Sequence, residues 1–408
     1  MTQTEIVDAP PRLTAAYWRL WWAAGINNVG NGAFAAALPL LAVTITRSPL
    51  LISAVAAATY LPWLVLSFPA GALVDRYDRA TLMSRAQTIQ AVIVGAVAVI
   101  AAFHRMNIAI LIIAAFGLGA GEVVFGNGAQ AILPDIVAKP LLYRANGAQQ
   151  TITVLGQQFA GPPIGSVLFA LSAALPFGLD AVSFAVSSAL LGTLPRNERG
   201  PAERVPMRTA IADGMRWLNR HRLLRALAIL VGVNNFCGQL GYATLVLLAT
   251  QTLHLSARGF GVLLAGAAVG SLAGSLVNAR IVKVIGPLAA LFISLAANVV
   301  VFLGIGVSPN AVVLGALMAL NGFVTMLWNI VTVSLRQDIV PSALLGRVNS
   351  VYRMLAWGLI PLGALAGGLV AHEFGFRAPY PVAGALRGIA LLFAAPVLIR
   401  AMRDHVAR

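Results

Sequence analysis

Two acidic residues lie inside long apolar stretches of the chain, where a carboxyl group can bind and release a proton. Glu122 is deep within residues 107–130, which contain no basic residue, and Asp180 lies nearer one end of residues 175–194. A carboxyl among apolar side chains prefers its neutral form when dry and its charged form when water reaches it. This pattern predicts a proton carrier at Glu122, with Asp180 as the second candidate. The alternative for each is a carboxyl hydrogen-bonded to an adjacent helix.

The composition indicates the medium in which these carboxyl groups lie. Hydrophobic residues make up 59% of the 408 residues and charged residues only 10%, whereas soluble proteins have about a quarter charged residues. About 20 apolar residues suffice to cross a bilayer as a helix. We therefore expect an integral membrane protein with twelve spans: the first between Arg19 and Arg47, and the others near residues 49–73, 81–102, 107–130, 147–171, 175–194, 226–250, 259–279, 285–306, 311–335, 351–371 and 380–399.

The chain contains an internal repeat, which divides these spans six and six. Residues 135–137 and 338–340 are both Asp-Ile-Val, and each is followed at the same distances by Leu-Leu, Arg and Asn. A repeat of this length indicates two similar halves in the same order. We predict two parallel six-helix bundles, residues 1–194 and 226–408, joined by a cytoplasmic linker over residues 195–225. Ile211, Met215 and Leu218 in this linker have helical spacing, which predicts an amphipathic helix on the membrane surface, held by anionic lipid or used for regulation or partner docking.

The distribution of positive charge predicts the orientation. With both termini in the cytoplasm, all but five of the 28 Lys and Arg residues lie on that side, the exceptions being Arg47, Arg105, Arg258, Arg377 and Arg387. This is the positive-inside pattern. It accounts for the net charge of +15 without a nucleic-acid partner, and it places the chain in the cell inner (plasma) membrane as a multi-pass protein.

Several classes of protein are excluded by missing residues. No Gly-x-x-x-x-Gly-Lys loop is present for an ATP-driven pump, and His372-Glu373 lacks the second histidine of a zinc hydrolase motif. Cys237 is the only cysteine, which excludes an internal disulfide and a cysteine metal cluster. We expect no enzyme activity, no cofactor and no metal.

The loop between the second and third predicted spans resembles the signature loop of the major facilitator superfamily. It reads Gly71-Ala72-Leu73-Val74-Asp75-Arg76-Tyr77-Asp78-Arg79, which is similar to the superfamily pattern Gly-x-x-x-Asp-Arg-x-x-Arg. In the fifth span, Gly161, Pro162, Pro163 and Gly165 resemble the signature of proton-coupled exporters, although Ser166 stands where that signature usually has a glycine. The paired Asp-Ile-Val segments look most like the exporter branch of enterobactin exporters and macrolide or tetracycline efflux pumps.

This resemblance implies an all-α fold with twelve transmembrane helices, and it assigns roles to particular residues. A cytoplasmic latch, which locks the two halves together in the outward-open state, falls on Gly71, Asp75, Arg76, Arg79, Asp135, Arg144, Asp338 and Arg347. The first, fourth, seventh and tenth helices line the cavity in the superfamily, so the substrate surface falls on Asn27, Asn28, Asn31, Asn234, Asn235, Gln239, Trp328 and Asn329. Amides also join helices, and both interpretations of these residues remain open.

The function predicted from these observations is export of a lipophilic small molecule by proton antiport through alternating access. The substrate, protons and membrane lipid are the expected partners, and the chain is expected to work as a monomer. The alternative is a facilitative or proton-symport importer of a small solute or lipid with the same fold. Only the fifth-span signature and Glu122 favour the exporter.

Overall fold

The computed structural model describes residues 13–195 and 207–406, and every regular element in these ranges is a helix. Some side chains inside these ranges are not described. Among them is that of Asp75, so the role predicted for this residue in the latch lies outside the described side chains.

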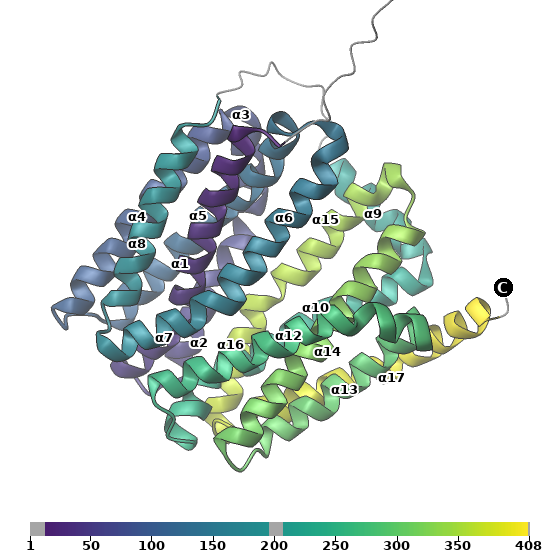
Figure 1. Cartoon of the computed structure of the whole chain (residues 1–408). Helices are drawn as coiled ribbons and strands as arrows, with labels where there is room; N and C mark the ends of the chain where they lie inside the picture. The colour runs from purple at the N-terminus through teal and green to yellow at the C-terminus, as the bar shows by residue number, and fades with distance from the viewer. Residues whose placement is uncertain (1–12, 196–206, 407–408) are drawn as a thin grey trace, which may run out of the picture.

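A first group of helices, α1 to α8, occupies the upper left of Figure 1. Within it, α8 packs against α1 and α4, α5 packs against α2 and α4, and α7 packs against α1. Its elements are α1 (Ala15–Ile45), α2 (Pro49–Val65), α3 (Ser67–Arg76), α4 (Arg79–Ala102), α5 (Ile108–Ile136), the 3₁₀ turn η1 (Lys139–Leu141), α6 (Leu142–Thr153), the π-helical turn η2 (Val154–Ala160), α7 (Gly161–Leu171) and α8 (Leu175–Gly192).

A second group, α10 to α17, occupies the lower right of Figure 1. Within it, α14 packs against α12 and α13, and α17 packs against α10 and α13. With the linker helix α9 (Met207–Arg220), its elements are α10 (Arg222–Tyr242), α11 (Leu245–Leu247), the π-helical turn η3 (Leu248–Thr252), α12 (Ala257–Ile285), α13 (Pro287–Gly306), α14 (Ala311–Ile339), α15 (Ser342–Gly358), α16 (Ile360–Phe374) and α17 (Pro379–Val406). We infer that the two groups correspond to the two predicted bundles.

Ten helical segments in the described ranges are long and apolar enough to cross a membrane. The other two predicted spans are formed by shorter helices. Residues 49–73 form α2, which has 17 residues, followed by α3. Residues 147–171 are split into α6, η2 and α7, and the π-helical turn comes just before Pro162 and Pro163. Proline has no N–H to donate to the preceding turn, so the helix ladder is disturbed at this point.

Helix α5 of the first group and helix α14 of the second group begin with the same kind of cap. Asn107 accepts a hydrogen bond from the Ile110 N–H at 2.9 Å at the start of α5, and Asn310 accepts one from the Val313 N–H at 3.0 Å at the start of α14. An asparagine before the first helical residue satisfies one of the unpaired N–H groups of the first turn. These caps determine where α5 and α14 begin.

Glycines allow the closest helix crossings. A Cβ atom added to Gly270 of α12 would lie 1.7 Å from the carbonyl oxygen of Ala319 in α14, and one added to Gly161 of α7 would lie 2.5 Å from Cα of Gly32 in α1. Any side chain at either position would force the helices apart. This agrees with the packing role expected for small residues at membrane helix interfaces.

The two groups meet along α2 with α16 and along α7 with α12. Gly368 of α16 lies against Ser53 of α2, and Gly261 of α12 lies against Ser166 of α7. These contacts are at the end of the molecule opposite α9, at the lower left of Figure 1. Closer to α9, Trp63 of α2 stacks on Trp357 of α15 with ring centroids 4.9 Å apart. We refer to these two ends as the α9 end and the opposite end.

The predicted linker helix is present as α9, and it packs against α15 of the second group. A Cβ atom on Gly214 would lie 2.6 Å from the carbonyl oxygen of Arg347, and Leu218 is buried with Leu224 in an apolar cluster. The side chain of Ile211 is not among those described. Helix α9 is therefore held by the second group and does not rest on the membrane surface alone.

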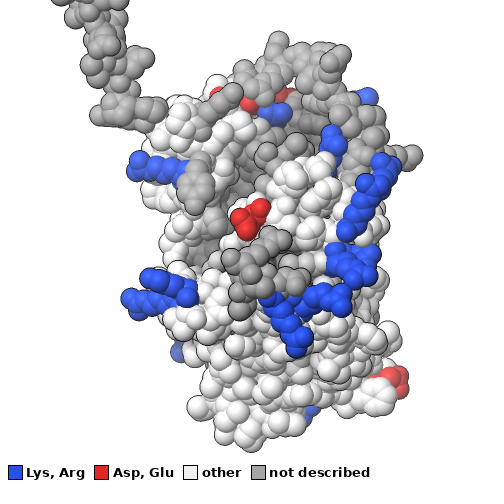
Figure 2. Space-filling view, turned by 90° about the vertical axis from the view of Figure 1, so that its right-hand side faces the viewer, with Lys and Arg blue, Asp and Glu red and all other residues white. Residues whose placement is uncertain are grey.

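Figure 2 views the molecule from the right-hand side of Figure 1, the side that carries α9 and the end of α17. Lys and Arg side chains gather on this face and few Asp or Glu side chains are visible. The surface is hollowed in its upper half. This face, which is on the side toward α9, is therefore rich in basic residues.

Candidate functional site

Glu122 lies midway along α5, next to α1. The amide Nδ2 of Asn31 donates to Glu122 Oε2 at 3.3 Å, and the Asn27 side chain, one turn earlier on α1, also reaches this carboxyl. Glu122 and Asn31 are partly exposed, whereas Asn27 is buried. The carboxyl group therefore lies at the edge of the first group, with protein amides on one side and an accessible surface on the other.

Asp180 of α8 lies deeper in the same group, with 1% of its surface exposed. The hydroxyl of Ser183 donates to Asp180 Oδ1 at 3.1 Å. Gly30 of α1 leaves room for this carboxyl, because a Cβ atom there would lie 2.3 Å from Oδ1. Asp180 is close enough to Glu122 for the two carboxyl groups to interact electrostatically. The structure thus brings the two candidate proton carriers together.

Two like carboxyl groups in a poorly hydrated place disfavour each other's ionisation. Among the described side chains, neither Glu122 nor Asp180 forms a salt bridge. A carboxyl group without a cationic partner can take up or release a proton as the water around it changes, which is the property required of a site that loads and unloads a proton.

The amides predicted to line the cavity are placed in two ways. Asn28 donates to the Ala24 carbonyl at 2.7 Å and to Thr153 Oγ1 at 3.3 Å, so it joins α1 to α6. Asn235 donates to the Ala356 carbonyl at 2.8 Å and joins α10 to α15. Of the other amides, Asn27 and Asn234 are buried, whereas Asn31, Gln239 and Asn329 are at least partly exposed. Asn28 and Asn235 therefore hold helices together in this conformation.

Trp328 is 2% exposed and packs with Leu327 and Val331 in an apolar cluster of the second group. Asn329, the next residue of α14, is exposed. In this conformation Asn329 presents a polar side chain at the surface, and Trp328 belongs to the packed interior.

The sequence prediction assigned Arg387 to the outer surface, but the structure buries it inside the second group. Its Nη1 donates to Asn298 Oδ1 at 2.7 Å, its Nη2 donates to the Asn234 carbonyl at 3.0 Å, and its guanidinium lies 3.7 Å from the centre of the Phe302 ring. A basic residue within an apolar helix is the signal that a count of loop charges overlooks. Arg387 thus connects α17 to α10 and α13.

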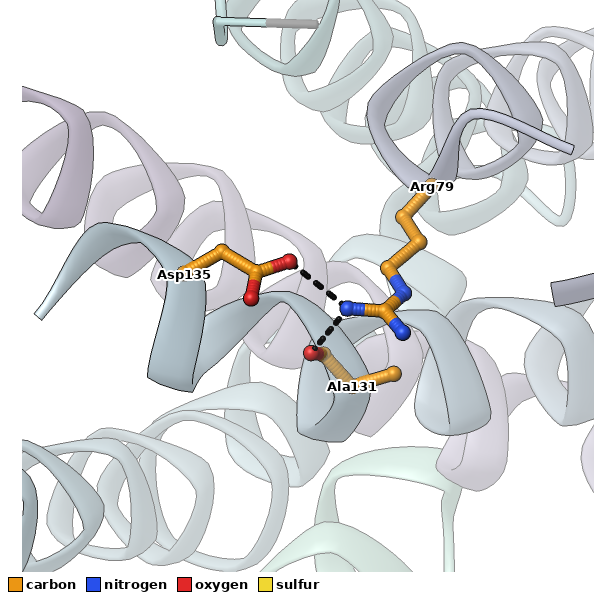
Figure 3. A network of polar contacts seen from close by, with 3 residues as sticks. All are labelled: Arg79, Ala131 and Asp135. Atoms are coloured by element: carbon orange, nitrogen blue, oxygen red, sulfur yellow. Dashed lines mark hydrogen bonds and ion pairs between the residues drawn. The ribbon is translucent and has the colours of Figure 1, made fainter. Parts of the chain in front are cut away.

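Arg79 of α4 and Asp135 of α5, two residues of the predicted latch, form an ion pair, and Figure 3 shows the contact. A single nitrogen, Nη1, donates to Asp135 Oδ2 at 2.6 Å and to the Ala131 carbonyl at 2.7 Å. Asp135 is 4% exposed and Arg79 is 21% exposed. This ion pair ties two helices of the same group together at the α9 end.

The remaining residues of the predicted latch are distributed around the α9 end. Arg76, Arg144 and Asp338 are exposed, Gly71 and Arg347 are partly exposed, and the side chain of Asp75 is not described. The described contacts between the two groups lie elsewhere, along α2 with α15 and α16, and along η2 and α7 with α12. A latch between the groups at the α9 end stays a prediction.

The residues of the predicted exporter signature form a contact surface on α7. Gly161 lies against Gly32 of α1, and a Cβ atom on Gly165 would lie 2.2 Å from the Ala33 carbonyl. The Ser166 hydroxyl donates to the Pro162 carbonyl at 2.7 Å, and this side chain faces Gly261 of the second group. The signature therefore packs α7 on α1 and brings it against α12.

The fold and these sites can be compared with known proteins. The multidrug efflux pump Tap of Mycolicibacterium fortuitum is 28% identical over 376 residues, which cover 88% of this chain and 90% of the pump. The enterobactin exporter EntS of Citrobacter koseri is 25% identical over 347 residues, covering 83% of this chain and 80% of the exporter. A crystal structure of a bacterial homologue of the iron transporter ferroportin in an inward-facing state has a TM-score of 0.72 and 16% identity, covering 95% of this chain and 99% of that one.

These similarities extend over nearly the whole chain, as does the match to a family profile described as transmembrane secretion effector, which covers residues 9–406. Long apolar helices, the signature loop before Arg79 and the glycine contacts of α7 are consistent with this match. The chain is a multi-pass membrane protein of the major facilitator superfamily and belongs to its transmembrane secretion effector family.

Proposed function

We propose that this protein exports a lipophilic small molecule from the cell in exchange for protons. The observation that carries the proposal is the pair of carboxyl groups in the first group. Glu122 is partly exposed beside Asn31, and the buried Asp180 is within electrostatic range of it. Ionisable residues inside membrane helices are costly, and proton relays in transporters are one of the functions for which they are retained.

The geometry supports alternating access, in which two bundles rock about a central site. The contacts of Ser53 with Gly368 and of Ser166 with Gly261 hold the groups together at the opposite end. With the α9 end in the cytoplasm, as the positive charge indicates, this arrangement is inward-facing. A proton on Glu122 would leave toward the cytoplasm, and the vacated carboxylate would then favour binding of substrate.

The proposal includes the topology predicted from the sequence. We propose twelve spans, made of the ten long segments and the interrupted segments α2–α3 and α6–α7. They would form two repeats of six, with both termini in the cytoplasm. The bacterial efflux relatives support the plasma membrane as the location. We propose a monomer that contacts membrane lipid along its apolar exterior.

The names of the relatives suggest the substrate class. One relative is a multidrug efflux pump and another is an enterobactin exporter. Both names fit export of a molecule of drug or siderophore size. Of the residues assigned to the cavity, those with exposed surface are the uncharged amides Asn31, Asn235, Gln239 and Asn329, so a largely uncharged molecule suits this surface.

The test is proton movement in proteoliposomes that carry a pH gradient, with a panel of macrolides, tetracyclines and catecholate siderophores. Wild-type protein should dissipate the gradient when one compound is added. Glu122→Gln should abolish this proton movement and retain exchange of the same compound between the two sides, because the amide cannot release a proton. Glu373→Gln is the matched control, since Glu373 is exposed at the end of α16.

Transport of a compound without proton movement in the wild type would overturn the antiport proposal and favour a facilitative carrier. If proton movement is unchanged in Glu122→Gln, the antiport proposal stands, but the proton carrier is Asp180 and not Glu122. In that case Asp180→Asn should abolish it.

A further inference from the structure

A layer of buried polar side chains crosses the interior of the first group. Gln87 and Gln90 of α4 and Ser183 and Ser187 of α8 are at most 5% exposed, and they lie on the helix faces that point into the bundle. Apolar clusters lie on both sides of this layer. One contains Val94, Val97 and Phe177 toward the opposite end, and the other contains Met83, Leu191 and Leu194 toward the α9 end.

The layer is continuous with the carboxyl pair. Ser183 donates to Asp180 Oδ1 at 3.1 Å, and Ser187 lies one turn further along α8. Gln90 lies directly against α5 beside Glu122: its Nε2 donates to the Leu118 carbonyl at 3.0 Å, and a Cβ atom on Gly121 would lie 2.4 Å from its Cδ. The carboxyl groups therefore form one edge of the polar layer.

Hydrogen bonds between α4 and α8 set the antiparallel register of the two helices. The Ser188 hydroxyl lies 3.0 Å from the Ser84 hydroxyl and 2.8 Å from that of Thr88. Gly192 lies against Ser84 on the same seam, and Gly95 lies against Ala181 further along. This register places Gln87 and Gln90 within about one turn of Ser187.

Several buried atoms of the layer have no protein partner among the described residues. They are Nε2 and Oε1 of Gln87, Oε1 of Gln90, Oγ of Ser187 and Oδ2 of Asp180. Buried polar groups are nearly always hydrogen-bonded, and water serves where protein atoms do not. A cluster of this kind next to a carboxyl pair is a place where water and hydroxyl groups can carry a proton.

An exit from the layer follows the α4–α8 seam. Met83 and Leu191, both fully buried, close the bundle interior toward the α9 end. The hydroxyl groups of Ser188, Ser84 and Thr88 pass beside this apolar barrier. They lead to a pocket of about 230 Å³ at the α9 end, lined by Ala80, Thr81, Ser84, Arg85, Gly192 and Leu194.

We propose that the α4–α8 seam is a proton pathway that connects the Glu122–Asp180 pair to the α9 end, separate from the route of the substrate. The inference rests on the proposed proton antiport. Protonated Glu122 or Asp180 gives its proton to the polar layer and becomes a carboxylate. Each hydroxyl or water along the seam accepts one proton and passes one on, so it ends unchanged, and the proton leaves as hydronium at the pocket.

Charged groups around the seam are compatible with this direction. Arg85 lines the pocket and is exposed, and Arg19 of α1 donates to the Thr193 carbonyl at the same end. Arg79 of α4 is paired with Asp135 of α5. The positive charges at the mouth disfavour retention of a proton there, so release into the bulk solution is favoured.

A separate pathway has a functional consequence. A proton released along the seam need not cross the substrate site, so substrate can bind from the α9 side while the proton is leaving. The proton and the substrate then influence each other's binding through the charge of Glu122, without occupying the same space.

The test changes two residues of the polar layer from which the seam leads, in Gln87→Leu and Ser187→Val, referred to here as the seam variants. The control is Ser294→Val, in which a buried serine of α13 in the second group is changed. In proteoliposomes with an identified substrate, both seam variants should slow substrate-driven proton movement about tenfold, while substrate exchange without a gradient stays close to wild type. The control should leave both rates unchanged. Ser187→Thr retains the hydroxyl and should recover most of the proton movement.

A second measurement does not depend on transport. Cys237 is the only cysteine, so a Cys237→Ser background permits single cysteines at Ser187 and Ser294. A membrane-impermeant thiol reagent with a permanent charge, methanethiosulfonate ethyltrimethylammonium at neutral pH, should label Ser187→Cys from the α9 side and leave Ser294→Cys unlabelled, because the thiolate is the reacting form. Absence of labelling at Ser187 together with normal proton movement in Gln87→Leu would overturn the seam pathway.

The failure of this inference is distinguishable from failure of the proposed antiport. If wild-type protein moves no protons with any substrate, the antiport proposal fails and the proton pathway is rejected with it. Labelling of Ser187→Cys would then show only that water reaches this site. If wild type moves protons and both seam variants do so at the wild-type rate, antiport stands and the seam pathway alone is rejected.

Discussion

Ser166 of α7 and Gly261 of α12 touch across the boundary between the two groups of helices. A Cβ atom added to Gly261 would lie 2.4 Å from Cβ and 2.5 Å from Oγ of Ser166, and the next nearest atom, the Pro162 carbonyl oxygen, is 3.7 Å away. The serine that departs from the usual exporter signature is therefore matched by a glycine on the facing helix. Their combined size determines how closely the two groups approach at the opposite end.

Gly261→Ala should prevent this close approach and slow substrate transport about tenfold, because overpacking at a tight contact costs about 1–3 kcal/mol. Adding Ser166→Gly removes both atoms that the new methyl group would meet, so the double variant should recover most of the transport rate. Transport in proteoliposomes measures this. Gly147→Ala is the control, since no atom lies within 4 Å of a Cβ there. Equal rates in the single and double variants would contradict this size relationship.

The stacked pair Trp63 and Trp357 should contribute to holding the groups together. The rings are 4.9 Å apart and inclined by 24°, and α2 and α15 both end within three residues of them. A double-mutant cycle with Trp63→Ala and Trp357→Ala should give a coupling free energy of about 1 kcal/mol in thermal unfolding. Trp22, which is 56% exposed, should show no coupling to Trp63. A coupling near zero would mean that the two rings only lie side by side.

Much of the fold follows from the sequence because membrane helices have strong local signals. Apolar length predicts the spans, and Asn107 and Asn310 cap the helices that the sequence predicts. The interruption of the fifth span was harder to predict. A π-helical turn precedes Pro162 because backbone carbonyls that lose their usual N–H partner at a proline must accept from other N–H groups. Which N–H groups they use is determined by packing on α1.

The site was predicted unevenly for a similar reason. Glu122 is recognisable because a carboxyl in an apolar stretch is rare, and Asp135 because it belongs to a repeated motif. Gln87 and Gln90 carry no such signal, since uncharged amides occur on any helix face. Arg387 was placed with the loop charges although its side chain is buried. Only the packing of α17 against α10 and α13 shows that this arginine points inward.

The Arg79–Asp135 pair should stabilise the α9 end of the first group. Arg79→Gln removes a charged hydrogen bond at 2.6 Å and a second bond to the Ala131 carbonyl. Because Asp135 is almost fully buried, we expect a loss of about 2 kcal/mol in the free energy of unfolding. Thermal unfolding in detergent measures this. Arg76→Gln, at an exposed position, should have little effect. If the two variants have the same unfolding temperature, loss of the Arg79–Asp135 contact costs no more stability than loss of an exposed arginine charge.

Arg387 should require a guanidinium and not merely a positive charge. Two different nitrogens donate to two different helices, Nη1 to Asn298 of α13 and Nη2 to the Asn234 carbonyl of α10, while the planar group stacks on Phe302. A lysine has one nitrogen and no planar surface, so it cannot reproduce both bonds and the ring contact. Arg387→Lys should therefore lower the free energy of unfolding by about 2 kcal/mol, nearly as much as Arg387→Gln.

Arg377 provides the matched control for this comparison. Its Nη1 alone donates to the Gly306 carbonyl at 3.2 Å and to the Ser308 carbonyl at 2.6 Å. Because one nitrogen forms both bonds, a lysine can replace it, and Arg377→Lys should change the unfolding temperature little. The measurement is thermal unfolding of the four proteins, wild type included, in the same detergent. If Arg387→Lys is as stable as the wild type, the role of Arg387 is electrostatic, and the two-helix connection through separate nitrogens is wrong.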